Sequence, residues 1–200
     1  MPSTMPPAGE YRFDIRRGGV LVATETERLA AGSLVGVRIA TDGTGRFEAE
    51  ARLDSDGLPT AVSVRYARGP FSRSAKYETE GEIIRGQLSA MAAREVVVAK
   101  LGRLREVDAD LVMFKALIIA RIRARAQALW VGRVATVDPA TLAVSSFKQS
   151  YRTRAGGLIW TFEPRMGDAD EIEIDSGGRI ARIARRDGSE VLLAGFRATV

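Results

Sequence analysis

The sequence predicts a mainly β protein (α+β) in which a long, curved antiparallel sheet, a half-barrel, wraps around one central apolar helix. Three observations support this fold. Apolar and polar residues alternate along most of the chain, turn segments separate the alternating runs, and one segment near the middle has helical character. Alternation is typical of antiparallel strands with one buried and one hydrated face, whereas buried parallel strands are continuously apolar.

The predicted strands come from both halves of the chain and are joined mostly by hairpins. Clear alternation occurs at residues 11–16, 46–53, 62–66, 158–162 and 171–175. Turn segments occur at residues 16–19, 42–43, 54–57, 175–178 and 187–188. Glycine permits positive φ in such turns, and aspartate accepts a hydrogen bond from the backbone two residues further on. We therefore expect ten or more strands.

The predicted helix extends from Leu111 to about Ala126, a segment without Gly, Pro or Thr. Asp108 and Asp110 precede it and can cap and charge its N-terminus. Its first ten residues are apolar on nearly every side, so other elements must cover it on several sides. We expect the sheet to curl around this helix. If the helix fills the concavity only in part, the remaining space is an apolar cavity.

The second half of this segment carries Arg121, Arg123 and Arg125, which would return the helix end to water and suit the negative end of its dipole. A strand built on the isoleucines of residues 118–122 is the alternative interpretation. After the segment, strand character resumes at residues 129–134 and 142–151. No linker divides the chain, so we predict one domain over residues 11–200, preceded by a disordered tail of residues 1–10.

The composition excludes several kinds of chemistry. The 200 residues include no cysteine and no histidine, which excludes disulfides, thiol nucleophiles, imidazole metal ligands and Ser-His-Asp catalysis. Gly-x-Ser-x-Gly, Walker and Gly-x-Gly-x-x-Gly motifs are also missing from the sequence. We therefore predict a protein that is not an enzyme and has no catalytic residues, no metal site and no cofactor. An enzyme built on carboxylates and lysine is a weaker alternative.

Charge and hydropathy argue against nucleic acid and a membrane span. The net charge is +5, but both signs are interspersed, and the basic excess at Arg103–Arg133 lacks the density and interleaved aromatic residues of a nucleic-acid interface. No apolar segment reaches the roughly 18 to 20 residues that cross a bilayer. Residues 1–10 do not resemble a secretory signal, so we expect a cytoplasmic location, or a periplasmic or envelope location for a processed form.

An acidic cluster lies between residues 168 and 175. It contains Asp168, Asp170, Glu171, Glu173 and Asp175. Three of these alternate along a predicted strand, and no EF-hand spacing follows. We interpret the cluster as a hydrated strand face that meets Arg179, Arg182 or Arg185 across a hairpin.

Lys115 is the most informative candidate for a binding site because its helical position lies inside the apolar arc. A lysine there extends to water at an edge, pairs with a carboxylate, or binds the anionic headgroup of a ligand. The residues predicted to contact a ligand are Phe114, Lys115, Ile118, Trp130 and Trp160. Core packing is the alternative role for the two tryptophans.

Four features follow one another along the chain: N-terminal hairpins, an Asp-x-Asp-Gly-Leu-Pro turn at Asp54–Pro59, a helix preceded by aspartates, and an Asp-x-x-Gly-Arg-Ile strand at Asp175–Ile180. This order resembles the half-barrel of bacterial lipoprotein carriers and of uncharacterised envelope families with that layout. The resemblance implies a non-enzymatic protein that holds an acyl chain or another apolar group.

The resulting prediction is a binding or carrier module for an apolar or amphipathic, lipid-like molecule. The alternative is a structural or interaction protein with a solid core, which acts through its surface or an exposed sheet edge. A homodimer is the protein partner that this alternative predicts.

Overall fold

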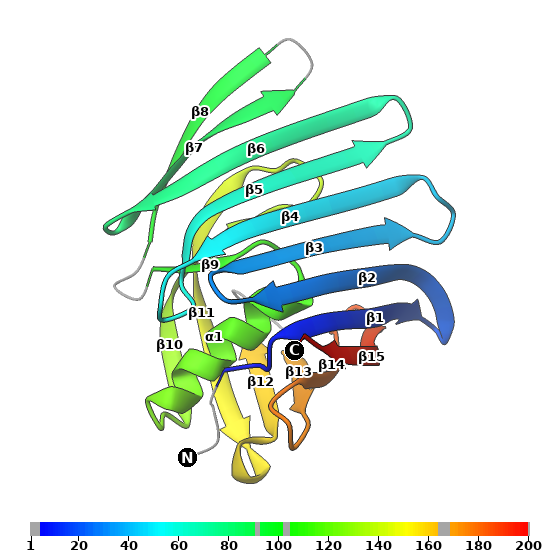
Figure 1. Ribbon diagram of the computed structural model, residues 1–200, viewed down its shortest axis with the longest axis vertical. Coiled ribbons are helices and arrows are strands. Elements are labelled where there is room, and N and C mark those ends of the chain that lie inside the picture. The colour runs from blue at the N-terminus through cyan, green and yellow to red at the C-terminus, as the bar shows by residue number, and fades with distance from the viewer. Residues whose placement is uncertain (1–4, 91–92, 102–104, 164–168, 200) are drawn as a thin grey trace.

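The computed structural model describes residues 5–90, 93–101, 105–163 and 169–199 (Figure 1). Over these residues the protein is mainly β, with fifteen strands in one sheet, one α-helix and one 3-10 turn. The sheet is open, with β8 at one end of the strand order and β9 at the other. The prediction of a mainly β protein with a single helix is confirmed.

The first eight strands follow one another as a meander. They are β1 (Gly9–Arg17), β2 (Val20–Ala30), β3 (Ser33–Ala40), β4 (Gly45–Leu53), β5 (Pro59–Arg68), β6 (Phe71–Glu80), β7 (Ile83–Ala90) and β8 (Ala93–Lys100). The remaining elements are β9 (Glu106–Asp108), α1 (Val112–Ala124), β10 (Leu129–Val137), β11 (Val144–Arg154), the 3-10 turn (Ala155–Gly157), β12 (Ile159–Glu163), β13 (Asp170–Ile174), β14 (Ile180–Ala184) and β15 (Ser189–Ala198).

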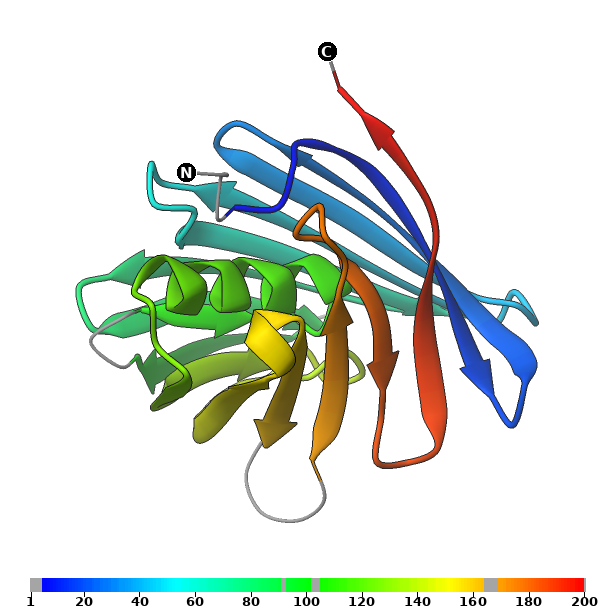
Figure 2. The ribbon, with the colours of Figure 1, turned by 90° about the horizontal axis from the view of Figure 1, so that it is seen from below.

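The topology explains where the helix lies. β1 pairs with β2 and also with β15, so the two ends of the described chain meet within the sheet. Antiparallel neighbours need only hairpins, but β9 pairs with β10 in parallel. A parallel pair requires a long crossover, usually a helix, and α1 occupies this one. Figure 2 shows the helix enclosed between the early strands and β10–β12.

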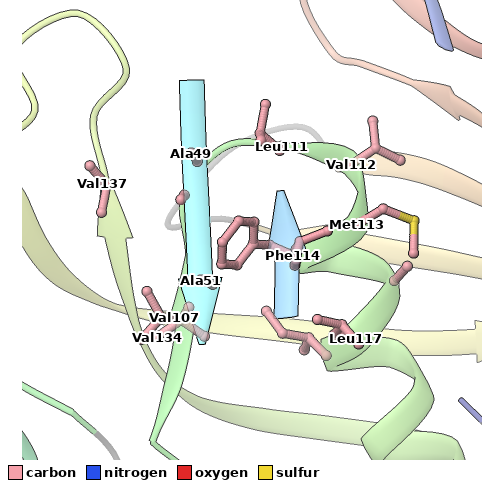
Figure 3. Packing of buried hydrophobic residues seen from close by; sticks show 14 of the residues in the cluster. Ala49, Ala51, Val107, Leu111, Val112, Met113, Phe114, Leu117, Val134 and Val137 are labelled. Atoms are coloured by element: carbon pink, nitrogen blue, oxygen red, sulfur yellow. The ribbon is translucent and has the colours of Figure 1, made fainter. Parts of the chain in front are cut away.

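The helix is buried along its length, from Val112 to Ile122. Small residues of the sheet allow it to approach closely. Figure 3 shows the Phe114 ring directed toward Ala49 and Ala51 of β4, all members of one buried cluster. A Cβ atom added to Gly36 of β3 would lie 2.4 Å from Cδ1 of Leu111. The concavity is therefore filled by tight packing around α1.

Two predictions about this segment are corrected. The strand interpretation of residues 118–122 is wrong, because these residues lie within α1. Arg121 does not return the helix to water, because it is only 5% exposed and pairs with a buried acid described below. Over the described residues, no helix has both the length and the apolar character needed to cross a bilayer.

The N-terminal segment is ordered earlier than predicted. Residues 1–4 lie outside the described part, but β1 already begins at Gly9, and Pro6 is buried. The Tyr11 hydroxyl donates a hydrogen bond to the Pro7 carbonyl, and Met5 packs against the core. These contacts replace the predicted disorder over residues 5–10.

Candidate functional site

The first turn of α1 is capped from the sheet rather than by its own preceding residues. Its N-cap residue, Leu111, offers no side-chain hydrogen bond. Instead, the Glu25 carboxylate of β2 accepts a hydrogen bond from the Val112 amide at 2.8 Å. Glu27 accepts one from the Met113 amide at 3.0 Å. These two acids accept hydrogen bonds from backbone amides that every helix leaves free at its N-terminus. Negative charge at this position also interacts favourably with the positive end of the helix dipole.

Glu25 and Glu27 form a buried carboxyl pair, and both side chains are fully buried. Burial raises the pKa of Glu27 well above its ordinary value of 4.5, and the Glu25 charge and a hydrogen bond between the two acids raise it further. The raised pKa favours the protonated form of Glu27, whose hydroxyl can donate a hydrogen bond to Glu25. Arg38 of β3 stands opposite Glu25, with Nε 2.7 Å from Oε2, and neutralises the remaining charge.

Arg38 extends this network from the sheet to the loop before the helix. Its Nη1 lies 2.7 Å from Oδ2 of Asp110, and its Nη2 donates to the Asp110 carbonyl. Burial alone would raise the pKa of Asp110, but the charges of Arg38 and Lys115 outweigh it and lower that pKa. Asp110 has a φ of 60°, a conformation that its two bonds to Arg38 hold in place.

The network ends at Lys115. Oδ1 of Asp108 accepts a hydrogen bond from the Asp110 amide at 2.8 Å, and Oδ2 of Asp108 binds the Lys115 ammonium at 2.6 Å. Both side chains are almost completely buried, and Lys115 Nζ also lies 5.6 Å from the centre of the Phe162 ring. Of the three roles considered for this lysine, pairing with a carboxylate is the one that the structure contains.

The predicted capping role of Asp108 and Asp110 is therefore corrected. Asp108 belongs to β9 and holds the lysine one turn into the helix, while Asp110 binds Arg38. The physical reason is that glutamates on β2 already reach the free helix amides. A second buried pair holds the far half of α1: Arg121 makes two hydrogen bonds to Glu106 of β9 and a third, of 2.7 Å, to the Gly57 carbonyl.

A pocket of about 410 Å³ opens beside the Lys115–Asp108 pair. Its residues come from β9, the start of α1, β10–β13 and the turn between β14 and β15. They are Asp108, Asp110, Lys115, Thr136, Phe147, Gln149, Phe162, Asp170, Arg185, Arg186 and Asp187. The volume is within the range of small-molecule sites, and the lining combines two aromatic rings with charged and amide groups. We call it the helix-start pocket.

Two acceptors in the helix-start pocket are buried. Gln149 is 3% exposed, and its amide nitrogen donates to the Thr136 hydroxyl at 3.1 Å. Its Oε1 accepts no hydrogen bond from any described residue. Asp170 is 9% exposed, and its carboxylate accepts a hydrogen bond from the Arg186 backbone amide at 3.2 Å. It makes no salt bridge within the described part of the chain. A buried acceptor without a donor costs about 1–3 kcal/mol, so a hydrogen bond donated to this oxygen would be stabilising.

The five residues predicted to contact a ligand do not share one pocket. Lys115 lines the helix-start pocket, whereas Trp160 lines a different pocket of about 430 Å³ at the C-terminal end of α1. Phe114, Ile118 and Trp130 are buried in the core and are not part of either lining. Trp130 packs on Tyr151, with ring centres 5.8 Å apart.

The acidic cluster divides between the two faces of its strand. Glu173 faces outward and binds Arg182 across the β13–β14 hairpin at 2.8 Å, as predicted. Arg179 instead binds Asp175 within its own turn, at 2.7 Å. Asp170 turns inward to the helix-start pocket, against the prediction of a hydrated face. Asp168 lies outside the described residues.

Sequence reasoning did not find Glu25, Glu27, Arg38 or Gln149. A signal for the glutamates was present, because they share the alternation phase of Ala23 and Leu29 on the buried face of β2. Acids at positions that strand periodicity assigns to the core require partners there. Gln149 has the same kind of signal, because it shares the alternation phase of Phe147 and Tyr151 on β11.

Comparisons with known proteins bear on the fold. No protein-family model matches the chain, and no curated protein matches it. The crystal structure of a DUF1089 family protein from Pseudomonas aeruginosa is similar, with a TM-score of 0.61 and 13% sequence identity, covering 90% of this chain and 94% of that chain. At this level of identity, the likeness shows that the two chains share an overall fold.

Proposed function

We propose that the protein is a non-enzymatic binding module for an amphipathic, lipid-like molecule, and that the polar part of this ligand enters the helix-start pocket. The observation that carries the proposal is Oε1 of Gln149, a residue of the pocket lining: this oxygen is buried and has no hydrogen-bond donor among the described residues. A ligand group would supply the missing bond.

The chemistry of the lining supports an amphipathic ligand. Phe147 and Phe162 offer apolar surface to a chain or ring, while Gln149, Asp170 and Arg185 offer polar contacts. Mixed linings of this kind are typical of sites in which apolar area gives affinity and a few polar groups give orientation.

The Glu27–Glu25–Arg38–Asp110–Asp108–Lys115 network supports a preformed site. Each link is a hydrogen bond or ion pair between buried or half-buried groups, so the wall of the pocket is held from the sheet. A site fixed before binding loses less conformational entropy when the ligand arrives.

The proposal places the ligand at the mouth of a half-barrel rather than inside it. The concavity around α1 is filled by side chains, so a lipid chain has no room beside Phe114 or Ile118. The carrier-like role that the resemblance to lipoprotein carriers implies is retained in this form: the apolar part of the ligand lies on Phe147 and Phe162.

Native mass spectrometry tests the proposal on protein purified without detergent. We expect a bound small molecule that is removed by organic extraction. Thr136→Trp fills the helix-start pocket and should abolish the bound mass. Thr153→Trp is the matched control, because Thr153 lines the pocket at the other end of the helix, and it should leave the bound mass unchanged.

A protein that carries no ligand and takes up no single-chain amphiphile would overturn the proposal. A bound molecule that persists in Thr136→Trp but is lost in Thr153→Trp would place the site at the other end of α1.

A further inference from the structure

The charges of the helix-start pocket bear on which headgroup it accepts. Lys115, the cation deepest in the pocket, is already neutralised by Asp108 at 2.6 Å. An anionic headgroup would have to compete with this buried carboxylate, and breaking a buried pair costs several kcal/mol. The other cations of the lining, Arg185 and Arg186, lie on the turn between β14 and β15 and are half-exposed or exposed.

The inner wall offers acceptors instead. Oε1 of Gln149 is buried without a donor, and the Asp170 carboxylate has only a backbone amide at 3.2 Å among described partners. They stand on β11 and β13, the strands on either side of β12, which carries Phe162. Two acceptors beside an aromatic ring suit a group that carries N–H or O–H donors.

We propose that the helix-start pocket selects an amphiphile whose headgroup donates hydrogen bonds, a primary ammonium or a hydroxyl, over one whose headgroup is an anion. This inference rests on the proposed function. The donor binds Oε1 of Gln149 and the Asp170 carboxylate, and the hydrocarbon chain leaves along Phe147 and Phe162.

Four probes with the same ten-carbon chain separate the alternatives: decylammonium, decane-1,2-diol, decyltrimethylammonium and decyl sulfate. Binding is measured by isothermal titration calorimetry below the micelle concentration. We expect decylammonium or the diol to bind at least about tenfold more tightly than decyl sulfate, since an acceptor left unpaired costs about one such factor. Decyltrimethylammonium has the charge without the donors, so it should bind as weakly as decyl sulfate.

Variants of Gln149 test whether this residue causes the preference for headgroups that donate hydrogen bonds. Gln149→Met removes the acceptor, so it should weaken the binding of decylammonium and of the diol, the donor probes, about tenfold. It should leave the affinity for decyl sulfate unchanged. Gln149→Glu keeps an acceptor and adds charge, so it should retain decylammonium binding and favour it over the diol. Gln127→Met is the control, because Gln127 lines the other pocket. Circular dichroism establishes that each variant is folded.

The outcomes separate this inference from the proposed function. If decyl sulfate binds as tightly as the donor probes, or if both Gln149 variants leave the donor probes unchanged, the headgroup inference is overturned while amphiphile binding stands. If none of the four probes binds, the inference falls together with the proposed function. Preference for decylammonium over the diol identifies the donor as an ammonium, and the reverse identifies a hydroxyl.

Discussion

At the scale of single residues, the core of this protein contains more charge than its alternating sequence suggests. Glu25, Glu27, Asp108, Lys115 and Arg121 are all buried. The free energy lost when these groups leave water is offset by direct pairing between opposite charges and by hydrogen bonds from helix amides. The sequence allowed pairing with a carboxylate as one role for Lys115, because a lysine inside an apolar arc has few alternatives. It could not identify Asp108 as the partner, since that depends on where β9 pairs.

The raised pKa of Glu27 predicts a pH-dependent stability. Because the pKa of Glu27 is raised in the folded protein, the native state holds a proton that the unfolded state releases above about pH 4.5. The contribution of Glu27 is greatest below that pH and is lost as pH rises toward its folded pKa, by up to about 1.4 kcal/mol per unit. Glu27→Gln mimics the protonated acid, so it should be increasingly more stable than wild type as pH rises through this range.

Urea unfolding between pH 4.5 and 8 measures this difference. Glu25→Gln is the matched control, because it removes the counter-charge of Arg38 and should destabilise the protein at pH 7 by about 1–3 kcal/mol. Parallel stability curves for wild type and Glu27→Gln would show that Glu27 is ionised in the folded protein.

The Lys115–Asp108 pair predicts a strong coupling between two substitutions. Lys115→Met leaves Asp108 buried and unpaired and should lower the free energy of unfolding by about 3–5 kcal/mol. Adding Asp108→Asn removes that charge but keeps the acceptor for the Asp110 amide, so the double variant should regain part of the loss. Additive losses in urea unfolding would contradict a direct buried pair.

At the scale of elements, the helix depends on small residues and acids of strands far away in sequence. The sequence predicted the bounds of the helix to within a few residues, because an apolar segment without alternating polar residues, Gly or Pro is not typical of a strand with one face in water. It could not predict the cap, because Glu25 and Val112 are 87 positions apart. Asp108 and Asp110 fitted the capping pattern, but the pattern does not say whether a side chain turns to the helix or away from it.

The close approach of α1 to β3 predicts a specific glycine requirement. In Gly36→Ala the new methyl group would meet Cδ1 of Leu111 at 2.4 Å and Cγ of Glu27 at 3.0 Å, so these two buried side chains must shift. Thermal and urea unfolding should show a loss of about 1–3 kcal/mol. Gly195→Ala meets no atom within 4 Å and should change stability by less than about 0.5 kcal/mol. Equal effects would argue against tight helix–sheet contact.

At the scale of the whole molecule, hairpin signals predict a long antiparallel sheet but not its strand order. Local turns specify most of the neighbours. The pairing of β1 with β15 depends on segments at opposite ends of the chain, and the parallel pairing of β9 with β10 depends on the crossover through α1. The pocket arises from the same long-range contacts, which is why strand alternation can place Gln149 and Asp170 on buried faces but cannot bring them together with Lys115.

The outer face offers a competing place for apolar molecules. At the end of the sheet, β8 exposes Val96 and Val98, at 69% and 56%. β8 is also the terminal strand of the sheet, a position that suits pairing with another chain, and the homodimer stays a prediction.

The most direct test of the account is an NMR titration of isotope-labelled protein with decylammonium and, separately, decyl sulfate. We expect the largest backbone amide shifts caused by a binding amphiphile to disappear in Thr136→Trp and to cluster at Asp108, Lys115, Gln149, Phe162 and Arg185. Shifts centred on β8, or saturable binding that leaves the helix-start pocket unperturbed, would contradict it.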